Sequence, residues 1–253
     1  MARLLIVTAD DFGYTSGVNA GIARAHREGI VTATSVMANM PAAGEAPGYR
    51  NAQPALRFGV HLTLTAGRPL TPPEQVPSLV DGQGRFLRRD ALLRSARPEE
   101  VALECRAQVA AVEALGIEPS HLDSHHHVHG FEPIVGVVKE IARERRLPVR
   151  PTSEAVRDSL RAAGIATADH LFDPLYSTDD DKTARLVGCL ETLPEGLSEL
   201  ICHPGEPDEA LAAASSYVAP RAAEVAALTS EQARLALERL DIRLVTYEAL
   251  QGT

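Results

Sequence analysis

The chain has 253 residues, of which 45% are hydrophobic and 23% charged, so a folded protein with a sizeable core is expected. The net charge of −9 argues against general binding to nucleic acid or anionic membranes, because phosphate contacts need clustered Lys and Arg. The three cysteines form no CxxC motif, and the N-terminal apolar run is too short for a signal peptide or membrane span. We therefore predict a cytoplasmic protein without membrane insertion.

Short apolar runs alternate with longer segments of helical period along the chain. Residues 3–9 predict a buried strand, and residues 16–29 predict a helix with Ser16 as N-cap. Residues 68–98 contain five prolines and no sustained period, which predicts a long surface connection. Further strands are predicted at 33–37, 58–64, 121–128, 148–150, 171–172, 200–203 and 243–247, and further helices at 99–115 and 133–146.

About seven strand-then-helix units follow one another without a linker-like shift in composition. This pattern predicts a single domain over residues 1–253, with an α/β fold of the distorted TIM-like (β/α) barrel type and about seven parallel strands. A doubly wound open sheet is the alternative, although no GxGxxG follows the first strand.

The segment HLDSHHHVH, residues 121–129, packs five of the nine histidines into nine positions. In a regular strand successive side chains alternate, so five of its polar side chains would share one face. These five are His121, Asp123, His125, His127 and His129. So many imidazoles without a ligand would have to be buried neutral or repel one another as cations. A metal site uses two or three of them, and the others would orient ligands or contact substrate.

Other candidate site residues stand near the ends of different predicted strands. TADDFG places Asp10 and Asp11 after the first strand, FGVHLTL contains His61, and ICHPG contains His203. Taken singly, such histidines are commonly core residues, and an Asp pair is as often a solvated turn. Because the carboxyl ends of the strands meet in a barrel, we expect these four residues and His125 to converge.

The chemistry of such a set can be stated from its residue types. One carboxylate and two imidazoles form a three-ligand site for a divalent metal, which polarises carbonyls and acidifies water. A free carboxylate beside the metal can accept a proton, and a free histidine can protonate a leaving amine. Together these functions describe hydrolysis of an amide.

The four motifs TADDFG, GVHLTL, HLDSHHHVHGF and ICHPG, in this order and spacing, resemble the YdjC-like (ChbG/HpnK) carbohydrate deacetylase family. Residues 215–230, SSYVAPRAAEVAALTS, resemble the C-terminal segment of that family. The resemblance implies a TIM-like barrel related to the polysaccharide deacetylases. It also implies a metal-dependent enzyme that removes N-acetyl groups from amino sugars, and it allows a homodimer.

The resemblance also implies roles for individual residues. Asp11, His61 and His125 would be the metal ligands. Asp10 would be the general base and His203 the general acid.

A further group would bind substrate or support the ligands and carboxylates, although Arg221 could equally form a surface ion pair. This group comprises Asp123, His127, Arg150 and Arg221. The roles of His121, His126 and His129 stay open. The resemblance implies magnesium as the single divalent metal, whereas a donor set with two imidazoles favours zinc or another transition metal.

The substrate and the alternatives follow from weaker features. Aromatic residues make up 4% of the chain and Trp is absent, which favours a short N-acetylglucosamine oligosaccharide or a glycolipid headgroup as substrate. A metal-dependent phosphoesterase or amidohydrolase is an alternative, since HxDxHxH patterns also build multinuclear metal sites. A non-catalytic sugar-binding module is a third hypothesis, although a binder needs neither a base nor an acid.

Overall fold

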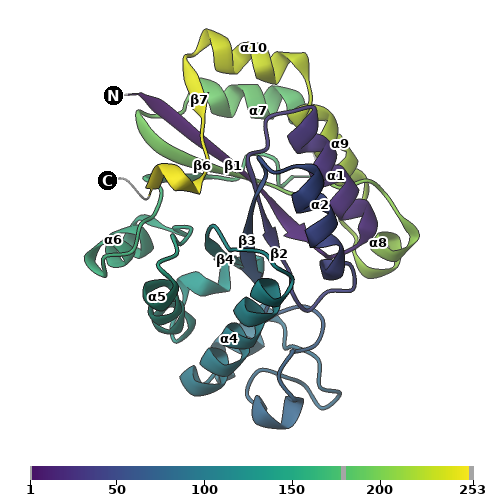
Figure 1. Cartoon of the computed structure of the whole chain (residues 1–253), viewed down its shortest axis with the longest axis vertical. Coiled ribbons are helices and arrows are strands. Elements are labelled where there is room, and N and C mark those ends of the chain that lie inside the picture. The colour runs from purple at the N-terminus through teal and green to yellow at the C-terminus, as the bar shows by residue number, and fades with distance from the viewer. Residues whose placement is uncertain (1, 178–180, 251–253) are drawn as a thin grey trace.

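The structure is a computed structural model, and it describes residues 2–177 and 181–250. These residues form a curled sheet of seven parallel strands in the order β4-β3-β2-β1-β6-β5, with β7 also paired to β1. Helices surround the outer side of the sheet, which gives the shape of a half-barrel (Figure 1). The predicted α/β fold of the TIM-like type is therefore confirmed.

The strands are β1 (Arg3–Phe12), β2 (Ala33–Val36), β3 (Arg57–Leu62), β4 (Leu122–Ser124), β5 (His170–Phe172), β6 (Gly196–Cys202) and β7 (Ile242–Leu244). The α-helices are α1 (Ser16–Arg27), α2 (Ala46–Ala52), α3 (Arg89–Ser95), α4 (Pro98–Ala114), α5 (Ile134–Arg145), α6 (Glu154–Ala162), α7 (Lys182–Glu191), α8 (Glu209–Ala214), α9 (Ala219–Leu228) and α10 (Glu231–Arg239). Short 3-10 helices span Ala43–Glu45, Pro73–Gln75, His125–Gly130 and Tyr247–Leu250.

Strand β1 lies at the centre of the sheet and determines where the site forms. It pairs with β6 along one edge, and along the other edge with β7 over Arg3–Leu5 and with β2 from Thr8 onward. Eight of its ten residues are buried, which is why the sequence shows an apolar run here. All partners are parallel, so the carboxyl ends of β1, β3, β4 and β6 lie at one end of the half-barrel.

The predicted strand over residues 121–128 was wrong beyond Ser124. The chain leaves β4 there and enters a 3-10 helix in which His126 and His127 have φ angles of 58° and 55°. The Ser124 hydroxyl closes this turn, because it accepts a hydrogen bond from the backbone N–H of His129 at 3.0 Å. The alternating polar residues have the period of a strand, but the positive φ angles break the alternation of their side chains.

Three smaller predictions also needed correction. Residues 68–98 are a connection as expected, but they contain α3 and a short bridge between Val80 and Phe86. The N-cap of α1 is Thr15 instead of Ser16, because the Thr15 side chain accepts a hydrogen bond from the N–H of Val18. Residues 148–150 form only an isolated bridge to β4, not a full strand.

Two further observations concern the helices and the cysteines of the described residues. No helix within residues 2–177 and 181–250 is long and apolar enough to cross a membrane. The cysteines Cys105, Cys189 and Cys202 are free.

Candidate active site

A pocket of about 830 Å³ opens at the carboxyl ends of the strands. It is lined by most of the residues that the sequence singled out, namely Asp10, Asp11, His61, His125, His127, His203 and Arg221. Tyr176 and Tyr217 line it on the side of the loop after β5, and Arg88 and Arg89 line it beside α3. Asp123 and Arg150 are fully buried beneath this pocket.

Both adjacent aspartates reach the pocket because β1 is irregular at its end. The pairing of β1 with β2 shifts register between Ala9 and Phe12, and Asp11 has a φ of 71°. In a regular strand neighbouring side chains point to opposite faces, so this irregularity turns the Asp10 and Asp11 carboxylates toward the same end. Gly13 follows at a φ of 93°, where a Cβ would come within 2.9 Å of the Ala43 backbone.

The Asp11 carboxylate lies beside two imidazoles, and its two oxygens have different neighbours. Its Oδ1 lies 3.1 Å from His125 Nδ1 and 3.5 Å from His61 Nε2, yet it is buried and has no hydrogen-bond partner among the described residues. Its Oδ2 accepts a hydrogen bond from Arg221 at 2.5 Å. Burial alone would raise the pKa of Asp11, but Arg221 and His125 outweigh it and hold that pKa well below its usual range.

This cluster fits a divalent metal ion. One ligand atom from each of Asp11, His61 and His125 lies within 4.8 Å of the other two. Two ligands about 2.0–2.1 Å from a tetrahedral ion lie roughly 3.4 Å apart, close to the separations seen here. Because Arg221 occupies Oδ2, Asp11 has only Oδ1 to offer such an ion. The donors are then two nitrogens and one oxygen, a set suited to zinc and other transition metals.

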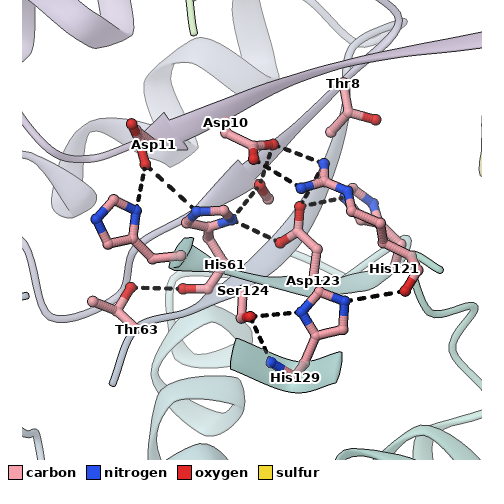
Figure 2. A network of polar contacts seen from close by, with 12 residues as sticks. Thr8, Asp10, Asp11, His61, Thr63, His121, Asp123, Ser124 and His129 are labelled. Carbon is pink, nitrogen blue, oxygen red and sulfur yellow. Dashed lines mark hydrogen bonds and ion pairs between the residues drawn. The ribbon is translucent and has the colours of Figure 1, made fainter. Parts of the chain in front are cut away.

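Hydrogen bonds to Nδ1 orient the His61 ring (Figure 2). His61 Nδ1 lies 2.8 Å from Asp123 Oδ1 and 3.0 Å from the Ser35 hydroxyl, which leaves Nε2 facing Asp11. Burial alone would lower the pKa of His61, but Asp123 and further carboxylates outweigh it and raise that pKa to about 10. A metal ion at this position must therefore displace a proton from the ring.

The Asp10 carboxylate is held by Arg150, a fully buried side chain. Arg150 donates to both oxygens of Asp10, at 2.7 and 2.8 Å, and also lies 2.8 Å from Asp123 Oδ2. This two-point contact fixes the plane of the carboxylate. Burial would raise the pKa of Asp10, but Arg150 outweighs it, so that pKa lies below its usual range.

Behind Arg150 lies a second layer that the sequence analysis missed. Arg150 Nε donates to Glu199 at 2.8 Å, and the same carboxylate accepts hydrogen bonds from the Tyr247 hydroxyl at 2.5 Å and from Thr8 at 3.0 Å. His121 stacks on the Tyr247 ring with centroids 3.8 Å apart. One signal was available in the sequence, since Glu199 is a charged residue in the apolar run of β6.

The structure separates the five residues that a strand would have placed on one face. His125 joins Asp11, whereas Asp123 and His121 lie in the buried layers described above. His127 lines the pocket, and burial lowers its pKa to about 4. His129 is buried below the pocket, where its Nδ1 lies 2.5 Å from the Ser124 hydroxyl and burial lowers its pKa to about 3.

His126 is the remaining histidine of this segment, and its ring centroid lies 3.9 Å from that of His125. It is exposed at the pocket wall, with its Nδ1 2.9 Å from the Thr65 hydroxyl. Burial of part of the ring lowers its pKa to about 4. His126 thus contacts His125, whose Nδ1 lies 3.1 Å from Asp11 Oδ1.

His203 approaches the pocket from the other side, directly after β6. Its backbone N–H donates to Glu224 at 2.5 Å, and Arg221 lies 3.4 Å from its carbonyl oxygen. Its Nδ1 is buried and has no hydrogen-bond partner among the described residues. Glu224 and Tyr217, which hydrogen-bond each other at 2.6 Å, come from the C-terminal segment, and Glu224 was not identified as a site residue in the sequence analysis.

The fold resembles that of a known class of protein. The parallel half-barrel has the fold of a family 4 carbohydrate esterase. The structure of one such esterase from Streptomyces lividans superposes with a TM-score of 0.52 at 11% identity, covering 98% of this chain and 95% of that one. At this identity the likeness shows the fold alone.

Sequence comparison narrows the class to a family. The family model described as YdjC-like protein matches residues 4–239, and the chain belongs to this family. It is 40% identical over 248 residues to a carbohydrate deacetylase of Brevibacillus brevis, covering 97% of this chain and 99% of the relative. A crystal structure of a protein from Enterococcus faecalis V583 matches with a TM-score of 0.92 at 37% identity, covering 99% of both chains.

Proposed function

We propose that this protein is a metal-dependent carbohydrate deacetylase that removes N-acetyl groups from amino sugars and releases acetate. The observation that carries the proposal is that two adjacent carboxylates are contacted by different side chains. Asp11 presents a free buried oxygen to two imidazoles, whereas Asp10 is clamped by Arg150 at the same end of the pocket. The relatives with the name carbohydrate deacetylase support the same reaction.

The proposed metal ligands are Asp11, His61 and His125. When bound, a divalent ion supplies Lewis acidity, which polarises the acetamide carbonyl and acidifies water. Asp123 holds His61 in the orientation that points Nε2 at Asp11, as carboxylates commonly do for metal-binding histidines. Arg221 occupies the second oxygen of Asp11 and balances its charge.

Asp10 is the proposed general base. Its lowered pKa keeps it ionised at neutral pH, so it is able to accept a proton from the attacking water. The two hydrogen bonds from Arg150 fix its direction and prevent it from turning toward His61 as a fourth ligand. The water oxygen forms a bond to the acetamide carbon as its proton passes to Asp10.

His203 is the proposed general acid. It lines the same pocket as Asp10, and its buried Nδ1 is not engaged by another described side chain. Protonation of the amide nitrogen by His203 accompanies cleavage of the C–N bond, which yields acetate and a free amino sugar. His127, neutral because burial lowers its pKa to about 4, is proposed to contact the substrate.

The proposed substrate is a small carbohydrate, and two features support this choice. A pocket of about 830 Å³ lies within the usual range for small-molecule sites. The chain also has no Trp with which to hold an extended sugar polymer. We further propose a cytoplasmic location, which the free cysteines support, and a homodimer stays a prediction.

One feature of the site speaks for deacetylation and against a multinuclear phosphoesterase. The second group able to converge on an ion is Asp10, His61 and Asp123. Arg150 already occupies both oxygens of Asp10 and one of Asp123. A cation added there would face a buried guanidinium, so a single metal position is favoured.

The test is acetate release by protein stripped of metal and then reloaded with magnesium, zinc or cobalt. Suitable substrates are N-acetylglucosamine, diacetylchitobiose and an N-acetylglucosaminyl lipid analogue. We expect release only from the reloaded protein, with zinc or cobalt more effective than magnesium because of the two imidazoles. Failure to release acetate with every ion would overturn the proposal.

A further inference from the structure

Tyr176 is an exposed aromatic side chain at the wall of the pocket. Its exposed fraction is 62%, the largest among the exposed large hydrophobic residues of the described chain. One face of its ring stacks on Tyr217, with centroids 5.0 Å apart and an angle of 26° between the planes. The exposure of the side chain and its place in the pocket wall leave ring surface accessible to a ligand.

The position of this ring is fixed by the residues around it. The Tyr217 hydroxyl is hydrogen-bonded to Glu224 at 2.6 Å and to the Leu175 carbonyl at 3.2 Å. The buried Lys182 ammonium donates to the carbonyls of Leu175 and Ser177, the residues on either side of Tyr176. An ordered ring loses less side-chain entropy on binding than a mobile one.

The ring also lies next to the proposed chemistry. The Tyr176 and His203 rings are 5.4 Å apart, and both line the pocket that contains Asp10 and Asp11. In an N-acetyl amino sugar the amide nitrogen is bonded directly to a ring carbon. A sugar whose nitrogen receives a proton from His203 must therefore place that same ring close to Tyr176.

We propose that the free face of Tyr176 is the stacking platform for the sugar ring that carries the acetamide. The C–H groups on one side of a pyranose ring form an apolar surface that matches an aromatic face. The inference rests on the proposed function, and it adds that recognition is centred on the reacting ring itself. Phe131 is less available for this purpose, because the Arg89 guanidinium lies 4.8 Å from its ring centroid.

A binding experiment tests the platform without needing turnover. The chain has no Trp, so Tyr176→Trp would introduce a sole tryptophan at the platform. We expect N-acetylglucosamine and glucosamine to change its fluorescence in a saturable way. Phe131→Trp is the matched control at the other exposed aromatic residue and should not respond. Absence of a response at Tyr176→Trp, or an equal response from both variants, would overturn the platform.

Kinetics provide the second test. Tyr176→Ala should raise KM for N-acetylglucosamine about three- to tenfold, the effect expected for loss of one ring contact. The loss should be smaller for hydrolysis of N-acetylethanolamine, an acetamide without a sugar ring. Tyr176→Phe keeps the aromatic face and should restore KM. Equal losses on both substrates, or a KM for N-acetylglucosamine that does not change, would contradict the proposal.

The two proposals fail in different ways. A fluorescence response without acetate release from any substrate would retain the sugar platform and overturn the deacetylase reaction. Acetate release with neither a fluorescence response nor a change in KM would retain the reaction and overturn the platform.

Discussion

Asp10 and Asp11 are neighbours in the sequence, yet their carboxylates have different partners. Both oxygens of Asp10 are bound by Arg150, a cation that is part of the chain. Asp11 has one oxygen on Arg221 and one buried oxygen with no hydrogen-bond partner in the described part of the chain. That oxygen lies 3.1 Å from His125 Nδ1 and 3.5 Å from His61 Nε2, a position that supports the proposal that it binds a metal ion.

The difference shows how one strand end can supply two chemical functions. The irregular end of β1 turns both carboxylates to the pocket, and their arginine partners come from segments far apart in the sequence. Arg150 follows the bridge beside β4, whereas Arg221 belongs to α9. The Asp10 carboxylate is thereby kept ionised and fixed in direction, and the Asp11 carboxylate is left able to bind an ion.

The most direct test of the different roles proposed for Asp10 and Asp11 is to replace each carboxylate by an amide in turn. Asp10→Asn should lower kcat on the order of 10²- to 10⁴-fold, because a general base contributes about that much. It should leave the bound metal near one equivalent, since the Asp11 cluster is untouched. Metal content by elemental analysis and acetate release by an enzyme-coupled assay are the two measurements.

Asp11→Asn is the matched control. It should lose activity together with metal, because its free oxygen is the proposed ligand atom. If Asp10→Asn lost metal as well, or kept wild-type turnover, the division of roles between the two aspartates would be wrong.

The pH dependence of metal binding tests the proposed ligand role of His61. Between about pH 6.5 and 10, metal must displace a proton from His61, whose pKa is raised to about 10. The apparent affinity should therefore rise with pH, roughly tenfold per unit for each proton released. Competition with a chelator at pH 6.5, 7.5 and 8.5 measures this slope.

Asp123→Asn provides the control for that slope. Asp123 is the largest of the influences that raise the pKa of His61, so its removal should flatten the dependence. An affinity independent of pH in the unaltered protein would show that the ring does not carry this proton.

The sequence was sufficient to locate the strand ends that carry the pocket residues. Asp10 and Asp11 follow the predicted strand over residues 3–9 and His203 ends the one over 200–203, whereas His61 and His125 lie inside predicted strands that end earlier in the structure. Parallel pairing brings the strand ends together. The structure places all five in one pocket, although their roles stay predictions. This part was predictable because it depends on topology, which hydrophobic runs reveal.

The layer beneath the pocket was not predictable from the same signals. Glu199 and Tyr247 meet Arg150 only because β7 and β6 both lie against β1, a pairing that leaves no mark in the sequence. The prediction of a strand over residues 121–128 was wrong for a different reason. The period of two in this segment is that of a strand, but a hydrogen bond to the Ser124 hydroxyl and two left-handed residues set its local path.

The smallest expected effect concerns stability and the buried residues Glu199 and Tyr247 behind Arg150. Tyr247→Phe removes a donor 2.5 Å from the buried Glu199 carboxylate, which keeps its contacts with Arg150 and Thr8. Loss of one hydrogen bond to a buried charge should lower the free energy of unfolding by about 1–3 kcal/mol. Denaturant titration of both proteins, at constant m-value, measures this difference.

The control for this prediction is Tyr14→Phe, which removes an exposed hydrogen bond to the Ala214 carbonyl. Its cost should be smaller, about 0.5 kcal/mol, because water can replace the lost partner. Equal costs for the two variants would mean that Glu199 gains little from Tyr247. The orientation of the Asp10 carboxylate would then depend on Arg150 alone, without a contribution from the Glu199–Tyr247 hydrogen bond.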